Sequence, residues 1–305
     1  AVGTYLVVLN VIDEDDDFPI SVRSALVLDV RETAPILSGT EDADGDGVPD
    51  ASDGTGDSDG NGVMQHYDAT AQANRLPSIA LAGDLFLIEA ENGLMLTLGD
   101  LAKLHGQGEA LLSEAQMVAE YEAKGTDSYR NIGGIFDLEV HGLRTTSRTL
   151  KLVIPQLAYL HPNAKMRIFD AQTGWKSFVS DGQDNVLEVA PAQGLGQCPG
   201  VDDTTYVPMG TAIADVSSLR ECLRITLNDG GINDLDGQEN GQIRLRAAVS
   251  MPADADGGTL NLANTSMTVT EVDGTIQIPV SRLGGASVGE TTVGWRVQFN
   301  GDTAA

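Results

Sequence analysis

The chain has 305 residues, of which 45 are acidic and 18 are basic, so its formal net charge at pH 7 is −27. This charge disfavours nucleic acids and anionic lipid surfaces as partners, because both are polyanions. No apolar run reaches the ~18 residues that a membrane-spanning helix requires, so direct insertion of this segment into a membrane is not expected.

The negative charge is concentrated in two short segments. Residues 13–17 and 41–68 together hold 14 of the 45 acidic residues and none of the 18 basic ones, and the remaining positions carry a net charge of −13. A block of like charge is usually solvated or disordered unless cations neutralise it. The spacing of the acidic residues therefore decides how the segments are interpreted.

Residues 42–68 contain two twelve-residue repeats with oxygen-bearing side chains at matching positions. The first repeat has aspartates at positions 1, 3, 5, 9 and 12, namely Asp42, Asp44, Asp46, Asp50 and Asp53. The second has Asp57, Asp59, Asn61 and Asp68 at positions 1, 3, 5 and 12, with Gln65 at position 9. This spacing, with glycine at position 6, is typical of a loop that wraps one Ca²⁺. The carbonyl groups of Val48 and Val63 would supply the position-7 ligands.

The two repeats start 15 residues apart, which leaves no room for the helices of an EF-hand pair. The segment resembles the aspartate-rich calcium repeats of thrombospondin type 3. That resemblance implies that bound ions hold a chain with little core of its own. An acidic flexible linker is the alternative.

The acidic run at 13–17 follows the strand-like sequence of residues 5–9 and precedes Phe18 and Pro19. It resembles the calcium-binding linker of cadherins, which implies that Asp13, Asp15, Asp16 and Asp17 bind Ca²⁺. An acidic turn without metal is the alternative. Residues 1–40 accordingly resemble the C-terminal part of a cadherin- or immunoglobulin-like β domain.

A third segment, residues 229–241, again spaces oxygen-bearing side chains between glycines. Its candidate calcium ligands are Asp229, Asn233, Asp234, Asp236 and Asn240. Sequences of this type also form ordinary turns without metal, so both interpretations stay open.

The chain has two cysteines, Cys198 and Cys222. In a secreted chain such a pair predicts one disulfide, although a buried free pair is the alternative. The bond would close a loop of about 25 residues and stabilise the fold by roughly 3 kcal/mol.

Apolar runs of strand length, separated by Gly, Asn and Asp turns, predict a mainly β fold of tandem sandwich-like domains. One helix is predicted at Ser113–Ala123, where Ser113 and Gln116 form a capping box. The strands predicted in the middle of the chain are Asp84–Glu89, Leu94–Leu98, Gly134–Val140, Thr149–Ile154, Lys165–Asp170, Trp175–Val179, Cys222–Leu227 and Gln242–Val249.

Several sequence stretches resemble a domain of large bacterial surface proteins, the choice-of-anchor U domain. They are Asp57–Val63, Asn74–Pro77, Leu98–Ala102, Asn131–Asp137, Val153–Gln156, Gly174–Trp175, Cys198–Pro199 and Cys222–Gly241. The resemblance covers residues 42 to about 250 and implies an extracellular setting without a known catalytic activity.

Residues 269–282, with Gly301–Ala305, resemble the opening half of a Calx-beta domain. That resemblance implies that Glu271 helps to bind Ca²⁺, and a turn residue is the alternative. The expected organisation is a partial β domain at 1–40, calcium loops at 41–76, the middle domain at 77–253 and a partial Calx-beta-like domain at 254–305. Incomplete domains at both ends predict a segment of a much longer protein.

No metalloprotease, nucleophile-elbow or phosphate-loop motif occurs, so an enzyme is not expected. We expect a calcium-stabilised structural or adhesive segment of an extracellular bacterial surface protein. Its partners would be Ca²⁺, neighbouring domains of the same chain and other copies in a fibre. The alternative is a calcium-dependent module that binds a surface glycan or protein. In that case Trp175 and Trp295, otherwise expected in cores, would stack on sugars.

Overall fold

The structure is a computed structural model. It describes residues 3–13, 20–30, 36–79, 85–105, 108–121, 128–144, 148–212, 220–252, 259–262 and 280–283. The chain divides into two compact units, residues 1–127 with 131–250, and residues 128–130 with 251–305. The prediction of a mainly β fold is confirmed, whereas the tandem arrangement of sandwich domains stays a prediction.

Two antiparallel strand pairs each form a two-stranded sheet of their own. β1 (Gly3–Asp13) pairs antiparallel with β2 (Ile20–Val30) in continuous register, from Gly3 opposite Val30 to Asp13 opposite Ile20. In the second unit, β15 (Thr259–Leu262) pairs antiparallel with β16 (Val280–Leu283).

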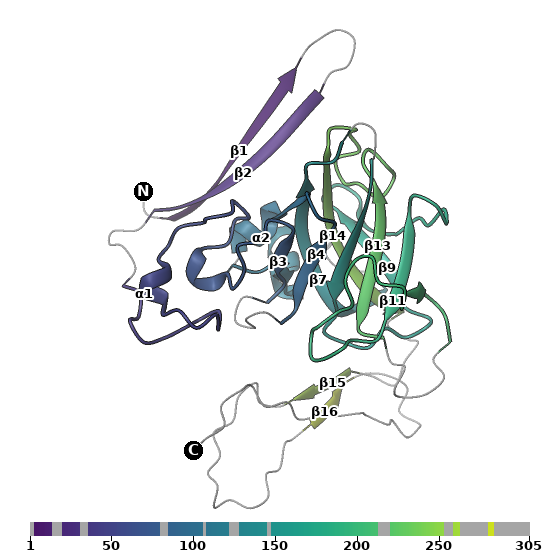
Figure 1. The fold of residues 1–305 in the computed structure, drawn as a ribbon. Coiled ribbons are helices and arrows are strands. Elements are labelled where there is room, and N and C mark those ends of the chain that lie inside the picture. The colour runs from purple at the N-terminus through teal and green to yellow at the C-terminus, as the bar shows by residue number, and fades with distance from the viewer. Residues whose placement is uncertain are drawn as a thin grey trace, which may run out of the picture. The chain divides into compact units, whose positions relative to one another are not determined.

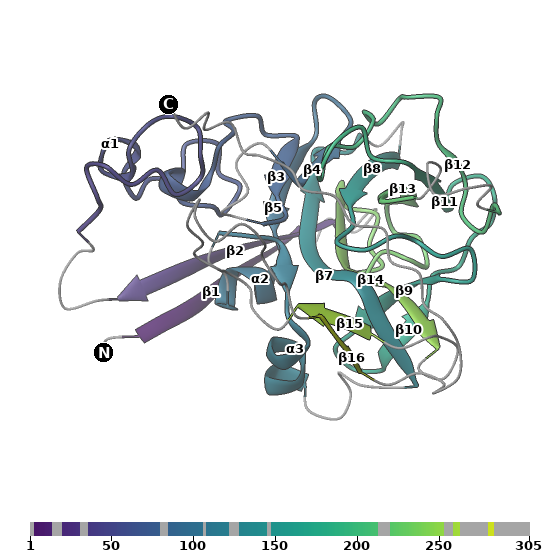
Figure 2. The same ribbon diagram turned by 90° about the horizontal axis from the view of Figure 1, so that it is seen from below.

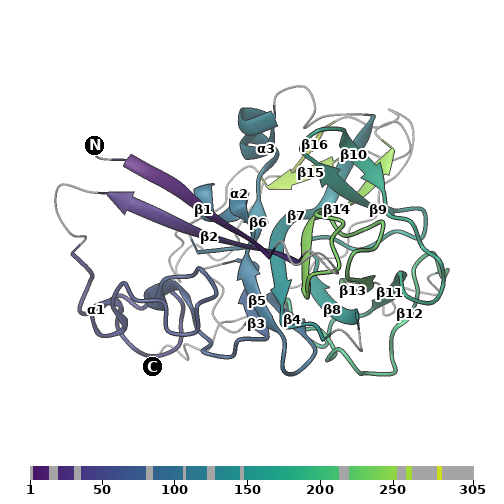
Figure 3. The same ribbon diagram turned by 90° about the horizontal axis from the view of Figure 1, so that it is seen from above.

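The first unit is built on two six-stranded sheets in a sandwich-like arrangement (Figure 1), and Figures 2 and 3 show them as separate layers. One sheet has the order β10-β9-β14-β7-β5 with β6 beside β7, and the other has the order β12-β11-β13-β8-β4-β3. The strands of the first sheet are β5 (Met95–Leu98), β6 (Leu111–Leu112), β7 (Tyr129–His141), β9 (Lys165–Asp170), β10 (Gly174–Ser177) and β14 (Gln242–Pro252). Those of the second are β3 (Arg75–Pro77), β4 (Leu87–Ala90), β8 (Thr149–Pro155), β11 (Val186–Ala190), β12 (Val207–Pro208) and β13 (Cys222–Asn228).

Each of the eight strands predicted for the middle of the chain coincides with a strand of these sheets, and Lys165–Asp170 matches β9 exactly at both ends. The sequence did not predict β3, β6, β11 and β12. Three of these have only two or three residues, which is too short for a recognisable apolar alternation, and their strand conformation depends on the partner strand.

The central strand β13 is buried at six consecutive positions, so side chains on both of its faces are covered. Its outer face lies under the chain that follows β11. Arg224 donates to the Val201 and Asp203 carbonyls at 2.9 and 2.8 Å, and its guanidinium stacks 4.3 Å from the Tyr206 ring centroid. This covering chain is anchored by the predicted disulfide, which the structure confirms between Cys198 and Cys222.

In the other sheet, a buried ion pair anchors two short helices, α2 (Asp100–His105) and α3 (Glu114–Tyr121). Asp137 on β7 accepts hydrogen bonds from the Leu101 and Ala102 N–H groups of α2 at 2.8 and 2.9 Å. Its other oxygen accepts from Arg246 on β14 at 2.9 Å, and Arg246 donates to the Tyr121 hydroxyl of α3 at 2.7 Å. The charges of Asp137 and Arg246 thus compensate each other inside the protein.

The predicted helix and its capping box are confirmed. Ser113 Oγ accepts from the Gln116 N–H at 3.2 Å, and the Gln116 side chain accepts from the Ser113 N–H at 2.7 Å. Helix α2 was not predicted, because its first turn is held by Asp137, which is distant in the sequence and cannot be read from local capping residues.

Replacing both cysteines by serine should lower the free energy of unfolding by about 3 kcal/mol, because the unfolded chain gains the freedom of the loop that the bond closes. Urea denaturation followed by circular dichroism measures this. Reductant should destabilise the wild type and leave the double variant unchanged. A double variant as stable as the oxidised wild type would contradict the structural role of the bond.

Candidate metal centre

The two twelve-residue repeats fold into loops that make the same backbone turns at positions 4 and 6. At position 4, Gly45 and Gly60 have φ values of 76° and 78°, and at position 6, Gly47 and Gly62 have φ values of 92° and 91°. Residues with side chains rarely adopt this left-handed region, so these glycines permit both sharp turns. The repetition predicted from spacing is therefore also a repetition of structure.

The position-1 aspartate organises each loop by accepting two backbone hydrogen bonds. Asp42 accepts from the N–H groups of Gly45 and Gly47 at 2.8 and 2.9 Å. Asp57 accepts from the equivalent two N–H groups of the second loop at 2.9 and 3.0 Å. The carboxylate is thereby fixed at the centre of its turn.

The side chains at positions 3 and 5 are fixed in the same way in both loops. Asp44 accepts from the Asp46 N–H at 3.2 Å, and Asp46 accepts from the Val48 N–H at 2.7 Å. In the second loop, Asp59 accepts from the Asn61 N–H at 3.1 Å, and the side-chain oxygen Oδ1 of Asn61 accepts from the Val63 N–H at 2.7 Å. Each loop therefore turns its oxygens inward with the help of its own backbone.

In the first loop these oxygens converge without a donor between them. One carboxylate oxygen from each of Asp42, Asp44 and Asp46 lies within 4.8 Å of the others. Asp44 is only 1% exposed, and its Oδ2 atom is buried without a hydrogen-bond partner. Burial and the nearby charge of Asp46 raise the pKa of Asp44 to about 6.

The last ligands predicted for the first loop lie on a single helical turn, α1 (Asp50–Asp53), which Gly54 ends with a φ of 79°. Asp50 accepts from the Ala43 N–H at 2.8 Å and so ties this turn back to the start of the loop. Asp53 Oδ2 is a second buried oxygen without a partner. Burial, with the neighbouring charges of Asp46, Asp42 and Asp50, raises the pKa of Asp53.

In the second loop an amide lies between the carboxylates. Asn61 is fully buried, and its Nδ2 donates to Asp59 Oδ2 at 3.2 Å and to Asp68 Oδ2 at 2.8 Å. Burial still raises the pKa of Asp68 to about 6 and also raises that of Asp59. Positions 3, 5 and 12 of the repeat are therefore in direct contact.

The second loop packs against the middle domain. The Leu98 N–H of β5 donates to the Asn61 carbonyl at 2.8 Å, and the Val63 side chain is 1% exposed. Beyond the loop, the 3₁₀ turn η1 (Gln65–Tyr67) carries His66, whose Nδ1 donates to the Gly54 carbonyl at 2.9 Å. Figures 1 and 3 both place the α1 segment on the side of the sheets where β3 and β5 lie.

The residues of the first loop fit a hard divalent cation. All of its candidate side-chain ligands are carboxylates, two of the oxygens are buried without a partner, and no Lys or Arg lies in residues 41–68. Oxygen donors of this kind suit Ca²⁺ or Mg²⁺.

The carboxylates of the 229–241 segment are occupied by backbone groups. Both oxygens of Asp229 accept N–H groups, from Asn240 and Gly241, and both oxygens of Asp234 accept N–H groups, at 3.0 Å from Gly230 and Arg244. Burial raises the pKa of Asp234 to about 7. These contacts hold the turn together, and a calcium ion here stays a prediction.

The other three candidates of this segment, Asn233, Asp236 and Asn240, also make internal contacts. Asn233 bonds to both backbone groups of Val179 and donates to the Asn185 side chain at 2.7 Å. Asp236 accepts from the Asn240 side chain at 3.2 Å. Asn233 therefore links the 229–241 turn to the chain between β10 and β11.

The remaining predicted ligands are not placed together. Asp13 ends β1, whereas Asp15, Asp16, Asp17 and Glu271 lie outside the described residues. Their role in calcium binding stays a prediction.

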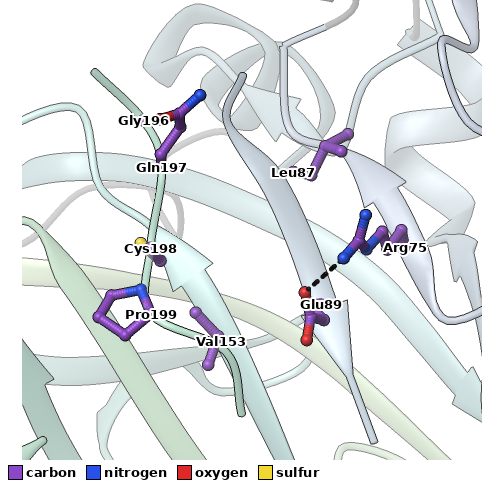
Figure 4. A pocket seen from close by; sticks show the side chains of 8 residues that line it. All are labelled: Arg75, Leu87, Glu89, Val153, Gly196, Gln197, Cys198 and Pro199. Carbon is purple, nitrogen blue, oxygen red and sulfur yellow. Dashed lines mark hydrogen bonds and ion pairs between the residues drawn. The ribbon is translucent and has the colours of Figure 1, made fainter. Parts of the chain in front are cut away.

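A small cleft of about 130 Å³ lies beside the disulfide (Figure 4). Arg75 and Glu89, whose charged groups are 3.3 Å apart, lie on one wall, and residues 196–199 form the other. No aromatic side chain lines this cleft. Trp175 instead packs edge-on against Phe169 at 5.3 Å, and Trp295 lies outside the described residues.

No family model matches this chain, and no curated protein or solved structure matches it.

The variant Asp44→Asn should raise the thermal midpoint of the metal-free protein at pH 7 by about 2–4 °C. The folded-state pKa of Asp44 lies near 6, above its ordinary value of 3.8. The stability that the raised pKa of Asp44 contributes is therefore present below pH 3.8 and lost as the pH rises through 6. The neutral amide avoids this loss, so the two midpoints should converge towards pH 4.

With Ca²⁺ present at pH 7 the wild type should have the higher thermal midpoint, because the Asp44→Asn variant lacks a charged ligand. Scanning calorimetry of metal-stripped and calcium-loaded protein provides both comparisons. The same order in both conditions would show that Asp44 is not a ligand.

Proposed function

We propose that this chain is a calcium-stabilised structural and adhesive segment of a large extracellular bacterial surface protein. The observation that carries the proposal is the pair of loops with matching backbone turns at positions 4 and 6 and inward-turned oxygens at matching positions. Calcium binding to both loops would make the stability of residues 42–68 depend on the extracellular calcium concentration.

The disulfide between Cys198 and Cys222 supports the extracellular part of the proposal, because such bonds persist in oxidising compartments. Among the helices in the described part of the chain, none has the length and apolar character needed to cross a bilayer.

A structural role is favoured over a sugar-binding role by where the aromatic rings lie. Tyr121, Phe169 and Trp175 pack in succession, with ring centroids 4.8 and 5.3 Å apart. The cleft of Figure 4 offers an ion pair in place of a ring on which a sugar would stack.

Chelation of calcium by EDTA should lower the thermal midpoint by at least about 5 °C, since an ion at a hundredfold excess over its Kd contributes about 2.7 kcal/mol per site. Ca²⁺ should restore the midpoint more fully than Mg²⁺, because the loops offer more oxygen ligands than Mg²⁺ accepts from a protein. Differential scanning calorimetry of the whole chain measures both effects.

The double variant Asp42→Asn with Asp57→Asn should lose most of this response. Asp202→Asn is the matched control, because it removes one carboxylate that is 79% exposed and pairs with Lys151, away from both loops. A midpoint that EDTA leaves unchanged in the wild type would overturn the proposed function.

A further inference from the structure

The two loops differ chemically at positions 5 and 9 of the repeat, and the difference at position 5 changes their hydrogen bonding. Position 5 is Asp46 in the first loop and Asn61 in the second. A carboxylate only accepts hydrogen bonds when ionised, whereas a carboxamide also supplies two N–H donors. The same place in the same turn therefore holds a charge in one loop and a donor in the other.

In the first loop, the backbone N–H groups leave two buried carboxylate oxygens without a donor. Asp44 is 1% exposed and its Oδ2 has no hydrogen-bond partner, and the same holds for the buried Oδ2 of Asp53. Buried, unpaired carboxylate oxygens cost free energy unless a cation or donor reaches them. In this loop the group at position 5 adds a further negative charge.

The second loop already contains such a donor. Asn61 Nδ2 bridges Asp59 and Asp68, which are the position-3 and position-12 residues, at 3.2 and 2.8 Å. The amide thus links the beginning and the end of the loop, as a bound cation would.

Packing separates the loops further. The position-7 side chain is 39% exposed at Val48 in the first loop and 1% exposed at Val63 in the second. The second loop also accepts the Leu98 N–H of β5 through the Asn61 carbonyl. Local unfolding is favoured where few apolar contacts and few long-range hydrogen bonds hold a segment, which describes the first loop.

We propose that only the first loop, residues 42–53, requires calcium to keep its folded form, and that Asn61 and the edge of β5 hold the second loop, residues 57–68, with or without the ion. This inference rests on the proposed function, because it assumes that Ca²⁺ binds this segment. Calcium would then stiffen residues 42–53, while the second loop stays packed against the middle domain. The concentration of calcium would set the flexibility of residues 42–53.

Hydrogen exchange of the whole chain, read by mass spectrometry with Ca²⁺ and with EDTA, tests the proposal. In EDTA the amides of residues 45–48 should exchange about tenfold or more faster, whereas those of residues 60–63 should change by less than about twofold.

Two reciprocal variants exchange the position-5 groups. Asp46→Asn, at an exposed position, should protect residues 45–48 in EDTA, because it brings a donor among the first-loop carboxylates. Asn61→Asp should make residues 60–63 exchange about tenfold faster in EDTA, with protection restored by Ca²⁺. Asn92→Asp is the matched control for Asn61→Asp, because it makes the same chemical change at an exposed Asn-Gly turn and should alter neither loop.

The outcomes separate this inference from the proposed function. Equal acceleration of both wild-type loops in EDTA, or an Asp46→Asn variant that gains no protection, would overturn the inference and leave calcium binding intact. If EDTA changes hydrogen exchange in neither loop and calorimetry detects no heat of Ca²⁺ binding, both the inference and the proposed function are overturned.

Discussion

The repulsion between carboxylates that the backbone holds close together is the constraint on which the first part of this molecule depends. In each loop, N–H groups of the turn fix the aspartates at positions 1 and 3 so that their oxygens face inward. Backbone hydrogen bonds orient these groups but supply no net positive charge. The loop geometry thus creates a demand for a counter-charge that residues 41–68, which contain no Lys or Arg, cannot meet.

The middle domain compensates its buried carboxylates with its own arginines. Asp137 and Glu139 on β7 are both buried, and each has an arginine partner on β14, at 2.9 Å in both cases. The guanidinium of Arg244 also reaches Asp100 of α2 at 2.7 Å. Buried charges are tolerated where such partners are built into neighbouring strands. Internal arginines therefore compensate these acids of the domain, whereas residues 41–68 supply the acids of the first loop with no Lys or Arg.

This contrast gives the two regions different physical characters. The sandwich is stabilised by buried apolar strands, a disulfide and internal ion pairs, none of which involves a soluble ion. The loop segment has little apolar material, and Val63 is the buried apolar residue that joins it to the domain. Stability in that segment is thus expected to follow the calcium concentration more closely than stability in the sheets does.

Much of this arrangement could be predicted from sequence, because local spacing determines it. Apolar runs of strand length predicted eight strands of the middle domain, and Ser113 with Gln116 predicted α3. The 1, 3, 5, 6 and 12 spacing predicted both loops, since glycine and aspartate act on the backbone within a few residues. Short strands such as β12 and the helix α2 could not be predicted, because β11 and Asp137 hold them from distant positions.

The sequence by itself determined that two equivalent acidic repeats exist and that the fold is mainly β, and it favoured one disulfide over a free cysteine pair. Only the tertiary structure decided that the loops are unequal. That inequality comes from the buried position of Asn61, from its bridge between Asp59 and Asp68, and from its carbonyl contact with Leu98. Spacing fixes which oxygens turn inward, but burial and contacts from a distant strand decide whether a loop can also hold itself together.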